Sequence, residues 1–494
     1  MNILLVYPEN PDTFWSFKHA LRFTNKKSSI PPLGLITVSS ILPKNWNKRL
    51  IDLNVTKLKH SDIIWADYVF ISGMYVQTES ANDIIAECKK YNVKIVGGGP
   101  LFTQNYNHYS HIDHLVLNEA EVTLSMFIND IESGKTPQRI YRSDEYADMT
   151  KTPVPDFGLL SMKDYVGMNI QVARGCPFAC DFCEITSLLG HKVRMKDTSQ
   201  VIAELDALYK LNWRGIVSIV DDNFIGNKKQ VKTDLLPAMI SWMKEHNHPF
   251  SFNTQTSIDL ADDKELMEMM IEAGFFSAFI GIETPDEQGL EDCNKVQNRN
   301  RNLLESVKKI QKAGFQVTGG FIVGFDSDSP TVFERQVEFI QESGIVSALV
   351  GMLNAPKNTR LYDRLEAENR ILADATGNTT DSTINFIPKM DISELMKGYN
   401  NIIHGIYSTK PYYKRARMFL KDQKVPHKRN KKFEPSIIFG FIKSVIVIGI
   451  IKRGRREYWK FIAWTLFRRP NLFVNAATLT VFGYHYRTVF KIRK

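Results

Sequence analysis

Three cysteines in one short stretch, Cys176, Cys180 and Cys183, constrain this chain more than any other feature. Their spacing is C-x₃-C-x₂-C. Cysteine thiolates are the usual ligands of a four-iron cluster, and three of them leave one of the four irons open. The stretch therefore predicts a loop that holds an iron–sulfur cluster whose open iron binds a substrate or a cofactor.

A structural zinc site is the main alternative for these cysteines. Such a site closes with four Cys or His ligands, and only His191 lies close downstream as a fourth ligand. Cys88 and Cys293 lie far from the trio in sequence and are typical of ordinary buried thiols. A chain of 494 residues with five cysteines and no secretory leader is expected to be a reduced, cytoplasmic protein.

Residues 1–142 alternate short apolar runs with segments of helical length. The runs are Ile3–Tyr7, Arg49–Asp52, Tyr68–Ser72, Val93–Gly97 and His114–Leu117. This alternation predicts an α/β, doubly wound Rossmann-like domain with a parallel sheet. Ligands of such folds lie beyond the carboxyl ends of the strands, where the run Gly97-Gly98-Gly99 allows the backbone to approach a nucleotide-sized cofactor.

The remaining chain divides at residues 143–165, which contain two prolines and are typical of a linker. Strand and helix alternation resumes over residues 166–355. The predicted strands are Met168–Val172, Gly215–Val220, Phe250–Gln255, Ala278–Glu283, Val317–Val323 and Ser347–Met352. Six such units predict a partial (β/α)6 TIM-type barrel with its site at the C-terminal ends of the strands. Residues 356–409 are expected to form a helical cover over the barrel mouth.

The cysteine spacing, with Phe182 before the last cysteine, resembles the signature of the radical S-adenosylmethionine (radical SAM) superfamily. The resemblance implies a [4Fe–4S] cluster whose open iron binds SAM. One electron, from a reductant such as flavodoxin or ferredoxin, then cleaves SAM to a 5′-deoxyadenosyl radical. The resemblance also implies SAM contacts at the strand ends, from Asp221, Asp222, Gln255, Glu283, Gly320 and Gly324. Acids and glycines are equally normal in solvated turns, so each residue alone is ambiguous.

The layout of residues 1–142 resembles the cobalamin-binding domain that precedes many radical SAM barrels. The residues that this resemblance places against the corrin are Asp52, Asn54, Ser72, Gly73, Gly97, Gly98 and Gly99. Some cobalamin domains carry D-x-H-x-x-G with a cobalt-ligating histidine, whereas this chain has Asn54 at the histidine position. Two interpretations stay open: a cobalamin domain without a protein ligand to cobalt, and a domain that keeps the fold without the cofactor.

Length, domain order and the tail look most like the branch that includes hopanoid and bacteriochlorophyll methylases. This likeness implies methylation of an unactivated carbon on a hydrophobic lipid, terpenoid or tetrapyrrole. One alternative is a radical SAM rearrangement, cyclisation or oxidation without methyl transfer, and another is an iron–sulfur redox or regulatory protein. A methylthiotransferase normally carries a second cysteine trio in its first domain, where this chain has only Cys88.

The basic charge of the chain resides in residues 410–494. That region has 22 Lys and Arg against three acids, a net charge of +19, so residues 1–409 carry −10 of the total of +9. Its apolar run, Ile437–Ile451, contains Lys443 and is shorter than the roughly 20 residues that span a bilayer. The mixture favours peripheral contact with the inner membrane face over nucleic acid, and a buried cap on the barrel fits it equally well.

Overall fold

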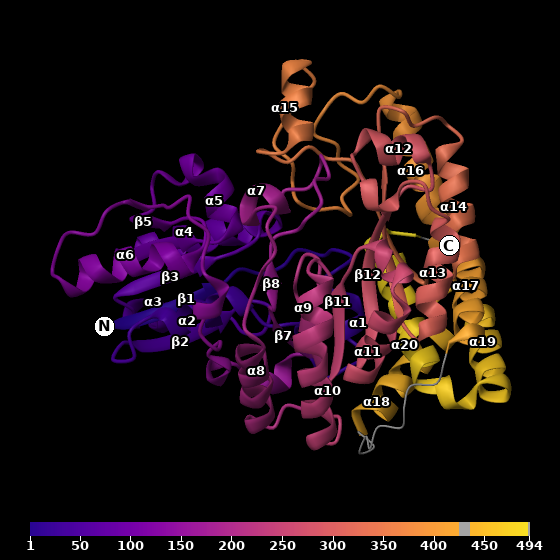
Figure 1. Ribbon diagram of the computed structural model, residues 1–494, viewed down its shortest axis with the longest axis horizontal. Helices are drawn as coiled ribbons and strands as arrows, with labels where there is room; N and C mark the ends of the chain where they lie inside the picture. The colour runs from indigo at the N-terminus through magenta and orange to yellow at the C-terminus, as the bar shows by residue number, and fades with distance from the viewer. Residues whose placement is uncertain (424–434, 493–494) are drawn as a thin grey trace.

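The computed structural model describes residues 1–423 and 435–492. Within them the chain is an α/β fold with two six-stranded sheets, and every pair of neighbouring strands in both sheets is parallel. The first sheet lies at the left of Figure 1 and the second at its centre, and the carboxyl-terminal helices lie at the right.

The first sheet has the strand order β2-β1-β3-β4-β5-β6. Its strands are β1 (Asn2–Tyr7), β2 (Asn47–Asp52), β3 (Tyr68–Ser72), β4 (Lys94–Gly98), β5 (His114–Val116) and β6 (Ile140–Tyr141). The order reverses between β1 and β3, which is the point where doubly wound sheets bind their ligands. The sequence predicts five of these strands. The sixth has only two residues, which is too short to show a periodic pattern.

Both faces of the first sheet are buried, as an all-parallel sheet requires. Successive residues of β1 point to opposite faces, so Leu4 and Val6 join one apolar cluster and Ile3 and Leu5 join the other. The first cluster packs against α3 (His60–Trp65), α4 (Thr78–Lys90) and α5 (Pro100–Asn105), and the second against α2 (Leu33–Ile41) and α6 (Ala120–Glu132).

The second sheet has the order β14-β13-β12-β11-β10-β7, with β14 and β7 as its edge strands. Its strands are β7 (Gly167–Ile170), β10 (Ile216–Ile219), β11 (Ser251–Gln255), β12 (Phe275–Glu283), β13 (Gln316–Val323) and β14 (Ser347–Met352). The outer helices are α8 (Thr198–Lys210), α10 (Leu236–Glu245), α11 (Lys264–Ala273), α13 (Leu303–Ala313) and α14 (Val332–Ser343). Consecutive parallel strands joined by helices, with two edges left, are the pattern of an open barrel.

The two ends of the chain meet against this second sheet. Phe14, in the loop after β1, stacks on Tyr486 of α20 (Phe473–Val489) with ring centroids 4.5 Å apart. Trp15 meets Phe279 of β12 edge to face at 5.2 Å. In Figure 1 the short helix α1 (Lys18–Leu21) accordingly lies beside the barrel strands, far from the first sheet. The first domain is thus tied to the barrel through its N-terminal loop.

The carboxyl-terminal region is a helical layer against the start of β14. Its helices are α16 (Ile392–Tyr407), α17 (Thr409–Asp422), α18 (Pro435–Ser444), η9 (Val445–Ile451), α19 (Arg455–Arg468) and α20. Tyr407 donates to the carbonyl of Ala348 at 2.6 Å, and Tyr486 donates to Ser347 Oγ at 2.9 Å. Fully buried Arg415 donates to the carbonyl of Val346 at 3.3 Å. Much of the tail is therefore packed on the barrel. No helix in the described ranges is long and apolar enough to cross a membrane.

We expect Tyr407→Phe to lower the free energy of unfolding by about 1–2 kcal/mol, because it removes one hydroxyl that both accepts from Ala348 N and donates to Ala348 O in a dry interior. Urea denaturation followed by tryptophan fluorescence measures the change. Tyr146→Phe, at a half-exposed ring, is the matched control and is expected to shift the midpoint little. Equal midpoints for both variants would contradict the anchoring role of Tyr407.

Candidate active site

The cysteine trio lies in the loop between β8 (Ala173–Arg174) and α7 (Ile185–Leu189). The loop closes on itself, since Cys176 N donates to Gly190 O at 3.3 Å and Cys183 N donates to Cys180 O at 3.1 Å. Gly175 has a φ of +90°, and a Cβ there would collide with the carbonyl of Lys192. Only glycine takes this conformation without strain, so Gly175 sets the turn into the loop.

Three parts of the molecule hold this loop. Gln104 of α5, in the first domain, donates to Glu184 Oε2 at 2.8 Å. Asn294, in the segment after α12 (Glu287–Asp292), donates to the carbonyl of Ala179 at 2.9 Å. The amide of Leu361, in α15 (Arg360–Ala367), donates to the carbonyl of Asp181 at 2.9 Å. The loop is therefore fixed from three sides.

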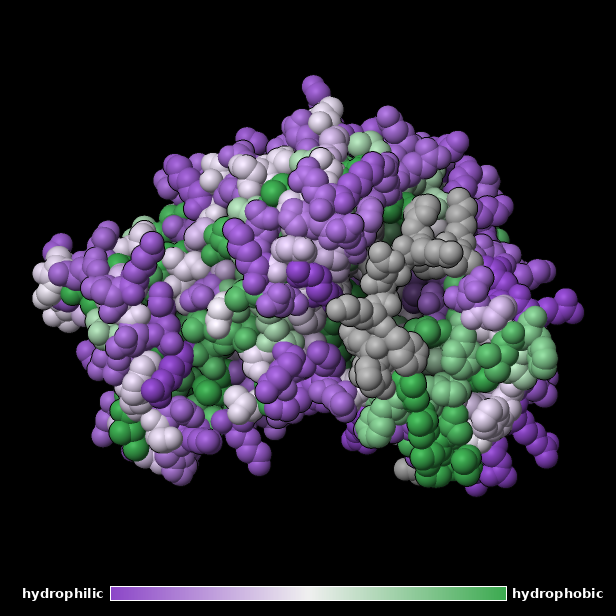
Figure 2. All heavy atoms as spheres, turned by 90° about the horizontal axis from the view of Figure 1, so that it is seen from below, coloured by the Kyte–Doolittle hydropathy of each residue, from purple (hydrophilic) through white to green (hydrophobic). Residues whose placement is uncertain are grey.

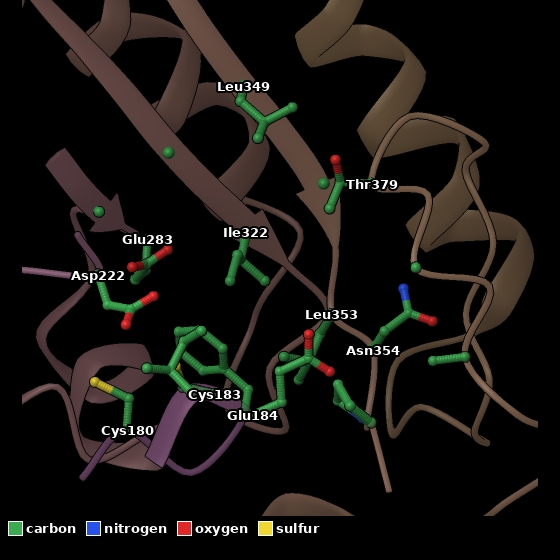
Figure 3. A pocket seen from close by; sticks show the side chains of 18 of the residues that line it. Cys180, Cys183, Glu184, Asp222, Glu283, Ile322, Leu349, Leu353, Asn354 and Thr379 are labelled. Atoms are coloured by element: carbon green, nitrogen blue, oxygen red, sulfur yellow. The ribbon is translucent and has the colours of Figure 1, made fainter. Parts of the chain in front are cut away.

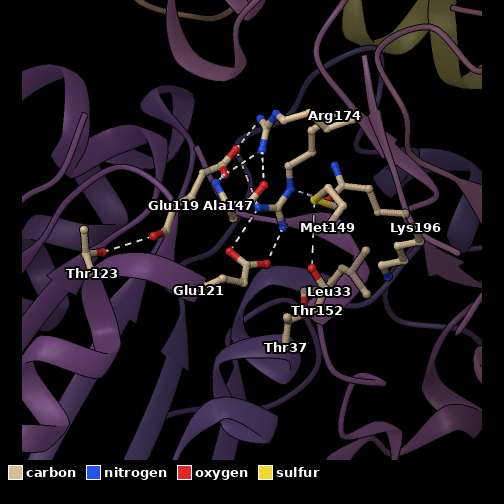
Figure 4. Close-up of polar contacts among 12 residues, drawn as sticks. Leu33, Thr37, Glu119, Glu121, Thr123, Ala147, Met149, Thr152, Arg174 and Lys196 are labelled. Carbon is tan, nitrogen blue, oxygen red and sulfur yellow. Dashed lines mark hydrogen bonds and ion pairs between the residues drawn. The ribbon is translucent and has the colours of Figure 1, made fainter. Parts of the chain in front are cut away.

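A buried network of charges ties the base of the loop to the first domain (Figure 4). Arg174 forms two hydrogen bonds to Glu121, at 2.6 and 3.0 Å, and Arg194 forms two to Glu119, at 2.6 and 2.9 Å. Burial alone raises the pKa of Glu121, but the hydrogen bond and the charge of Arg174 hold it below its usual value. We name these four residues the interdomain clamp.

A cavity of about 510 Å³ opens above the cysteines. Its walls come from the cysteine loop, the carboxyl ends of the barrel strands, and three residues of the first domain, Tyr75, Gln104 and Asn105. Figure 3 shows Cys180 and Cys183 at one side of it, with the carboxylates of Asp222 and Glu283 nearby and Leu349, Asn354 and Thr379 farther along. The cavity thus joins the first domain and the barrel.

Several polar atoms in the cavity wall are buried without a partner in the part of the chain that the structure describes. They are Asp222 Oδ2, Thr256 Oγ1, Gln297 Oε1 and Asn354 Oδ1. A buried polar atom without a hydrogen bond is costly, so such a cluster indicates a polar ligand. The charged amino acid end, ribose and adenine of SAM suit this set of donors and acceptors.

The two adjacent aspartates after β10 have different surroundings. Asp221 is buried, and its Oδ1 accepts from the amide of Val172 at 2.7 Å, which braces the chain just before the cysteine loop. Asp222 lines the cavity. Burial raises the pKa of Asp221 to about 7 and that of Asp222 to about 6. Both were expected at the SAM amino group, and only Asp222 faces the cavity.

Glu283 ends β12 in a left-handed conformation with a φ of +64°, which is unusual for a residue other than glycine, asparagine or aspartate. Its carboxylate pairs with Lys295 Nζ at 2.6 Å, with both side chains almost fully buried. A Cβ at Gly281 would collide with both groups of this pair. Burial alone lowers the pKa of Lys295, but the charge of Glu283 and the nearby Cys180 raise it above its usual value. A fixed cation therefore lies beside the cysteines.

The donor set of the cysteine loop fits a cluster. Burial raises the pKa of the Cys183 thiol to about 12, so a metal is needed to hold it as a thiolate at neutral pH. Gln297 Nε2 lies 3.7 Å from Cys180 Sγ, as a donor to a ligating sulfur would. No three His, Cys, Asp or Glu side chains among residues 1–423 and 435–492 converge on one ion. A four-iron cluster does not require convergence, because each thiolate binds a different iron.

The other predicted SAM residues divide in the same way. Gln255 and Gly320 line the cavity, and a Cβ at Gly320 would collide with the ring of Phe279. Gly324, with a φ of +106°, makes a turn after β13, where its amide donates to Asp328 at 2.7 Å. It is not among the lining residues. His191, the fourth ligand in the zinc hypothesis, is exposed in the turn after Gly190.

The residues expected at a corrin gather at the carboxyl edge of the first sheet. Asp52 and Asn54 use their polar atoms on protein groups: Asp52 accepts from Tyr165 at 2.9 Å, and Asn54 accepts from Asn10 N at 2.8 Å and donates to Pro8 O at 3.2 Å. The others, which surround this edge, are Ser72, Gly73, Gly97, Gly98 and Gly99. None of this set lines the cavity, whereas Tyr75, which follows β3, does.

The polar atoms of Asp52 and Asn54 already have protein partners, and the contact of these two residues with a cobalamin stays a prediction. A cobalamin would be accommodated at the face of the cavity that the first domain supplies, with Tyr75, Gln104 and Asn105. Gly99, with a φ of +81°, directs the chain into α5, which carries the last two of these residues.

Several cavity residues were not predicted from the sequence. Lys295 and Gln297 follow a short helix and no motif marks them. The segment that includes Asp374 and Thr379 is an irregular stretch between α15 and α16 that reaches the cavity. Asp374 pairs at 2.7 Å with Lys357, which lies before α15. These residues are revealed by their proximity in the fold, because no spacing in the sequence marks them.

Comparisons with known proteins agree with this geometry. The model of the radical SAM superfamily matches residues 170–340, and a domain of unknown function, DUF4070, matches residues 359–494. The chain is 40% identical to the uncharacterised methyltransferase sll1242 of Synechocystis, over 98% of this chain and 91% of that protein. It is 31% identical to the hopanoid C-2 methylase of Rhodopseudomonas palustris, over 94% of this chain and 89% of that protein.

Solved structures show the same fold. The cobalamin-dependent radical SAM enzyme OxsB, with aqua-cobalamin and SAM bound, aligns over 100% of this chain and 84% of its own with a TM-score of 0.63 at 15% identity. The methyltransferase TsrM from Kitasatospora setae, with cobalamin and a [4Fe–4S] cluster, aligns over 93% and 98% with a TM-score of 0.60 at 13% identity.

The fold and the cysteine loop define a radical SAM enzyme. The chain belongs, more narrowly, to the radical SAM family that includes the hopanoid C-2 methylase.

Cys180→Ser is expected to lower the iron content after anaerobic reconstitution to roughly a tenth of the wild-type value, since a hydroxyl is a poor ligand for a four-iron cluster. Cys293→Ser is the control, because the Cys293 thiol is buried near the cavity and donates to the carbonyl of Leu290 at 3.6 Å, a bond that a serine hydroxyl can replace. Iron analysis and the visible absorption of the cluster measure the outcome. Equal iron loss in the control would contradict the assignment.

The pKa of about 6 for Asp222 predicts weaker SAM binding in acid. A raised pKa means that the carboxylate is neutral below about pH 6, so its attraction for an ammonium group falls as the pH drops. Equilibrium dialysis of the cluster-loaded enzyme should show about tenfold weaker binding at pH 5 than at pH 7.5.

Asp222→Asn should weaken SAM binding at pH 7.5 by about tenfold and remove most of the pH dependence between 5 and 7.5. Asp234→Asn, at an exposed aspartate on the outside of the barrel, is the matched control and should keep both the wild-type SAM affinity and its pH dependence. A pH profile unchanged in Asp222→Asn would assign the titration to another group.

Proposed function

We propose that this enzyme is a cobalamin-dependent methyltransferase that methylates an unactivated carbon of a hydrophobic, polycyclic lipid or tetrapyrrole. One observation carries the proposal: the cysteine loop, the strand-end polar groups and residues of the first domain line a single cavity. Relatives that cover most of the chain and carry methylase names support it.

The walls of the cavity suit an apolar molecule beside polar cofactors. Asp222 and Glu283 lie near the cysteines, Gln297 approaches Cys180 at 3.7 Å, and Leu349 lies farther along beside Asn354 and Thr379, while Ile322, Met352 and Leu353 add apolar surface to the same wall. An apolar substrate surface binds such side chains by exclusion of water. A radical abstraction requires the substrate carbon to lie close to the deoxyadenosyl group of SAM, which would bind near the cysteines.

Named residues have separate tasks in this proposal. Cys176, Cys180 and Cys183 hold the [4Fe–4S] cluster, and Asp222 and Glu283 bind the polar end of SAM. Gln255 and Gly320 face its nucleoside part, while Tyr75, Gln104 and Asn105 form the wall toward cobalamin. When bound, SAM with the cluster would supply a carbon-centred radical, and cobalamin would supply the methyl group. The protein orients them and excludes water.

Cobalamin and cytoplasmic location belong to the proposal. Asn54 is engaged by Pro8 and Asn10, so the chain offers no ligand to cobalt at that position. The five free thiols suit a reducing compartment, where a one-electron donor such as flavodoxin or ferredoxin is available.

A second candidate is a radical SAM reaction on the same kind of substrate without methyl transfer. The engaged side chains of Asp52 and Asn54 favour it, because they leave fewer groups for a corrin. A relative at 26% identity over 53% of this chain, from Cereibacter sphaeroides, is an anaerobic magnesium-protoporphyrin IX monomethyl ester cyclase.

The test is a product assay with the reduced, cluster-loaded enzyme, cobalamin, SAM and a hopanoid, the substrate class in the name of the relative from Rhodopseudomonas palustris. We expect both 5′-deoxyadenosine and S-adenosylhomocysteine, and a substrate heavier by one methylene unit in mass spectrometry. Cys180→Ser should yield neither product, whereas Cys293→Ser should yield both.

Deoxyadenosine with a changed substrate and no S-adenosylhomocysteine would overturn methyl transfer and support the second candidate. Cobalamin retained after anaerobic purification would favour the first candidate, and its failure to bind would favour the second.

A further inference from the structure

The carboxyl-terminal region has an apolar face that points away from the protein. Figure 2 shows hydrophobic side chains gathered at the lower right, over the carboxyl-terminal helices. The exposed members on α18 and η9 are Ile438, Phe439, Ile442, Ile446, Ile450 and Ile451, and those on α19 are Trp459, Leu466 and Phe467. Phe467 is 87% exposed and Ile451 66%. We name these nine residues the apolar face.

The pattern along α18 and η9 is the reverse of that of an ordinary surface helix, which turns polar residues to water. Exposed isoleucines recur at intervals of four, while Ile448 is buried. The inner side holds the helix in place: Phe441 packs edge to face on Phe473 at 5.0 Å, and Ser444 Oγ lies 3.1 Å from the hydroxyl of Tyr458. The apolar residues therefore stay exposed on a fixed helix.

The surroundings of the apolar face are basic. Six exposed cations border it: Lys452, Arg453, Arg455, Arg456, Lys460 and Arg468. Glu457 is the single acid in residues 435–492, and it already pairs with Lys460 at 2.9 Å and Arg417 at 3.4 Å. Lys443 Nζ lies 4.5 Å from the ring centroid of Phe439. An apolar centre with a cationic border is complementary to the acyl chains and head groups of an anionic bilayer.

We propose that residues 435–468 form a docking surface for an anionic lipid bilayer, which assigns a role to part of the region matched by the domain of unknown function. The isoleucines, Trp459 and Phe467 insert at the head-group boundary, and the six cations contact lipid phosphates. The inference deepens the proposed function. It rests on that function for one point only, which is that a lipid-soluble substrate resides in such a membrane.

The docking surface lies at the opposite end of the barrel from the cavity. The helices that carry it pack on α20 and α17, which bond to residues Val346 and Ser347 at the start of β14, whereas the cavity lies at the strand ends. Figure 1 shows α18 and α19 below and α7 above. The surface therefore attaches the enzyme to the membrane and is not the entrance to the cavity.

Sedimentation with vesicles tests this inference without substrate or turnover. The full-length, cluster-loaded protein should bind vesicles of phosphatidylglycerol and phosphatidylcholine, and bind pure phosphatidylcholine or high-salt samples far less. The double variant Ile451→Ser and Phe467→Ser should lose roughly tenfold or more of this binding. Ile64→Ser, at a 65% exposed isoleucine of α3, is the matched control and should bind as the wild type does.

Absence of binding to anionic vesicles, or equal loss in the Ile64→Ser control, would overturn the inference. A dimer that dissociates in the double variant, seen by analytical ultracentrifugation, would also overturn it, because a second copy would then cover the apolar face. Failure of vesicle binding alongside normal products refutes only the docking surface. Vesicle binding without the methylated product refutes only the proposed chemistry.

Discussion

The interdomain clamp is the interaction on which the rest of the site depends. Arg174 lies two residues before Cys176, and its two hydrogen bonds to Glu121 fix the base of the cysteine loop to a helix of the first domain. Arg194 repeats the arrangement with Glu119, and it lies on β9 (Arg194–Met195), the antiparallel partner of β8. Removal of one member of a buried pair leaves an uncompensated charge, which costs several kcal/mol. The two domains therefore keep one mutual position, and the cavity between them keeps its shape.

The sequence predicted most of the fold because parallel strands leave a strong pattern. Eleven of the twelve strands in the two sheets fall on the predicted runs, and the two-residue β6 was missed. The region after α15 is less regular than the expected helical cover, since an irregular segment runs between α15 and α16 and supplies part of the cavity wall. Such a segment has no periodicity to detect.

The candidate site was predictable where chemistry follows one local spacing, as in the cysteine trio. It was less predictable where distant segments meet. Asp221 and Asp222 are neighbours in sequence, yet one braces a turn and the other faces the cavity. Lys295 has no local signal, and its position beside Glu283 follows from a tight approach that only Gly281 permits. For the tail, composition alone allowed a membrane surface or a buried cap, and the structure divides it: Phe461 and Tyr486 are buried, while Trp459 and Phe467 are exposed.

The separation of the apolar face from the cavity determines from which side each substrate and cofactor would reach the cavity. A protein attached to lipid by α18 and α19 turns its cysteine loop toward the aqueous side, where a soluble electron carrier and fresh SAM arrive by diffusion. A membrane-resident substrate must then leave the bilayer completely and pass along the length of the barrel before it reacts. The enzyme would thus handle single molecules that have been extracted from the membrane.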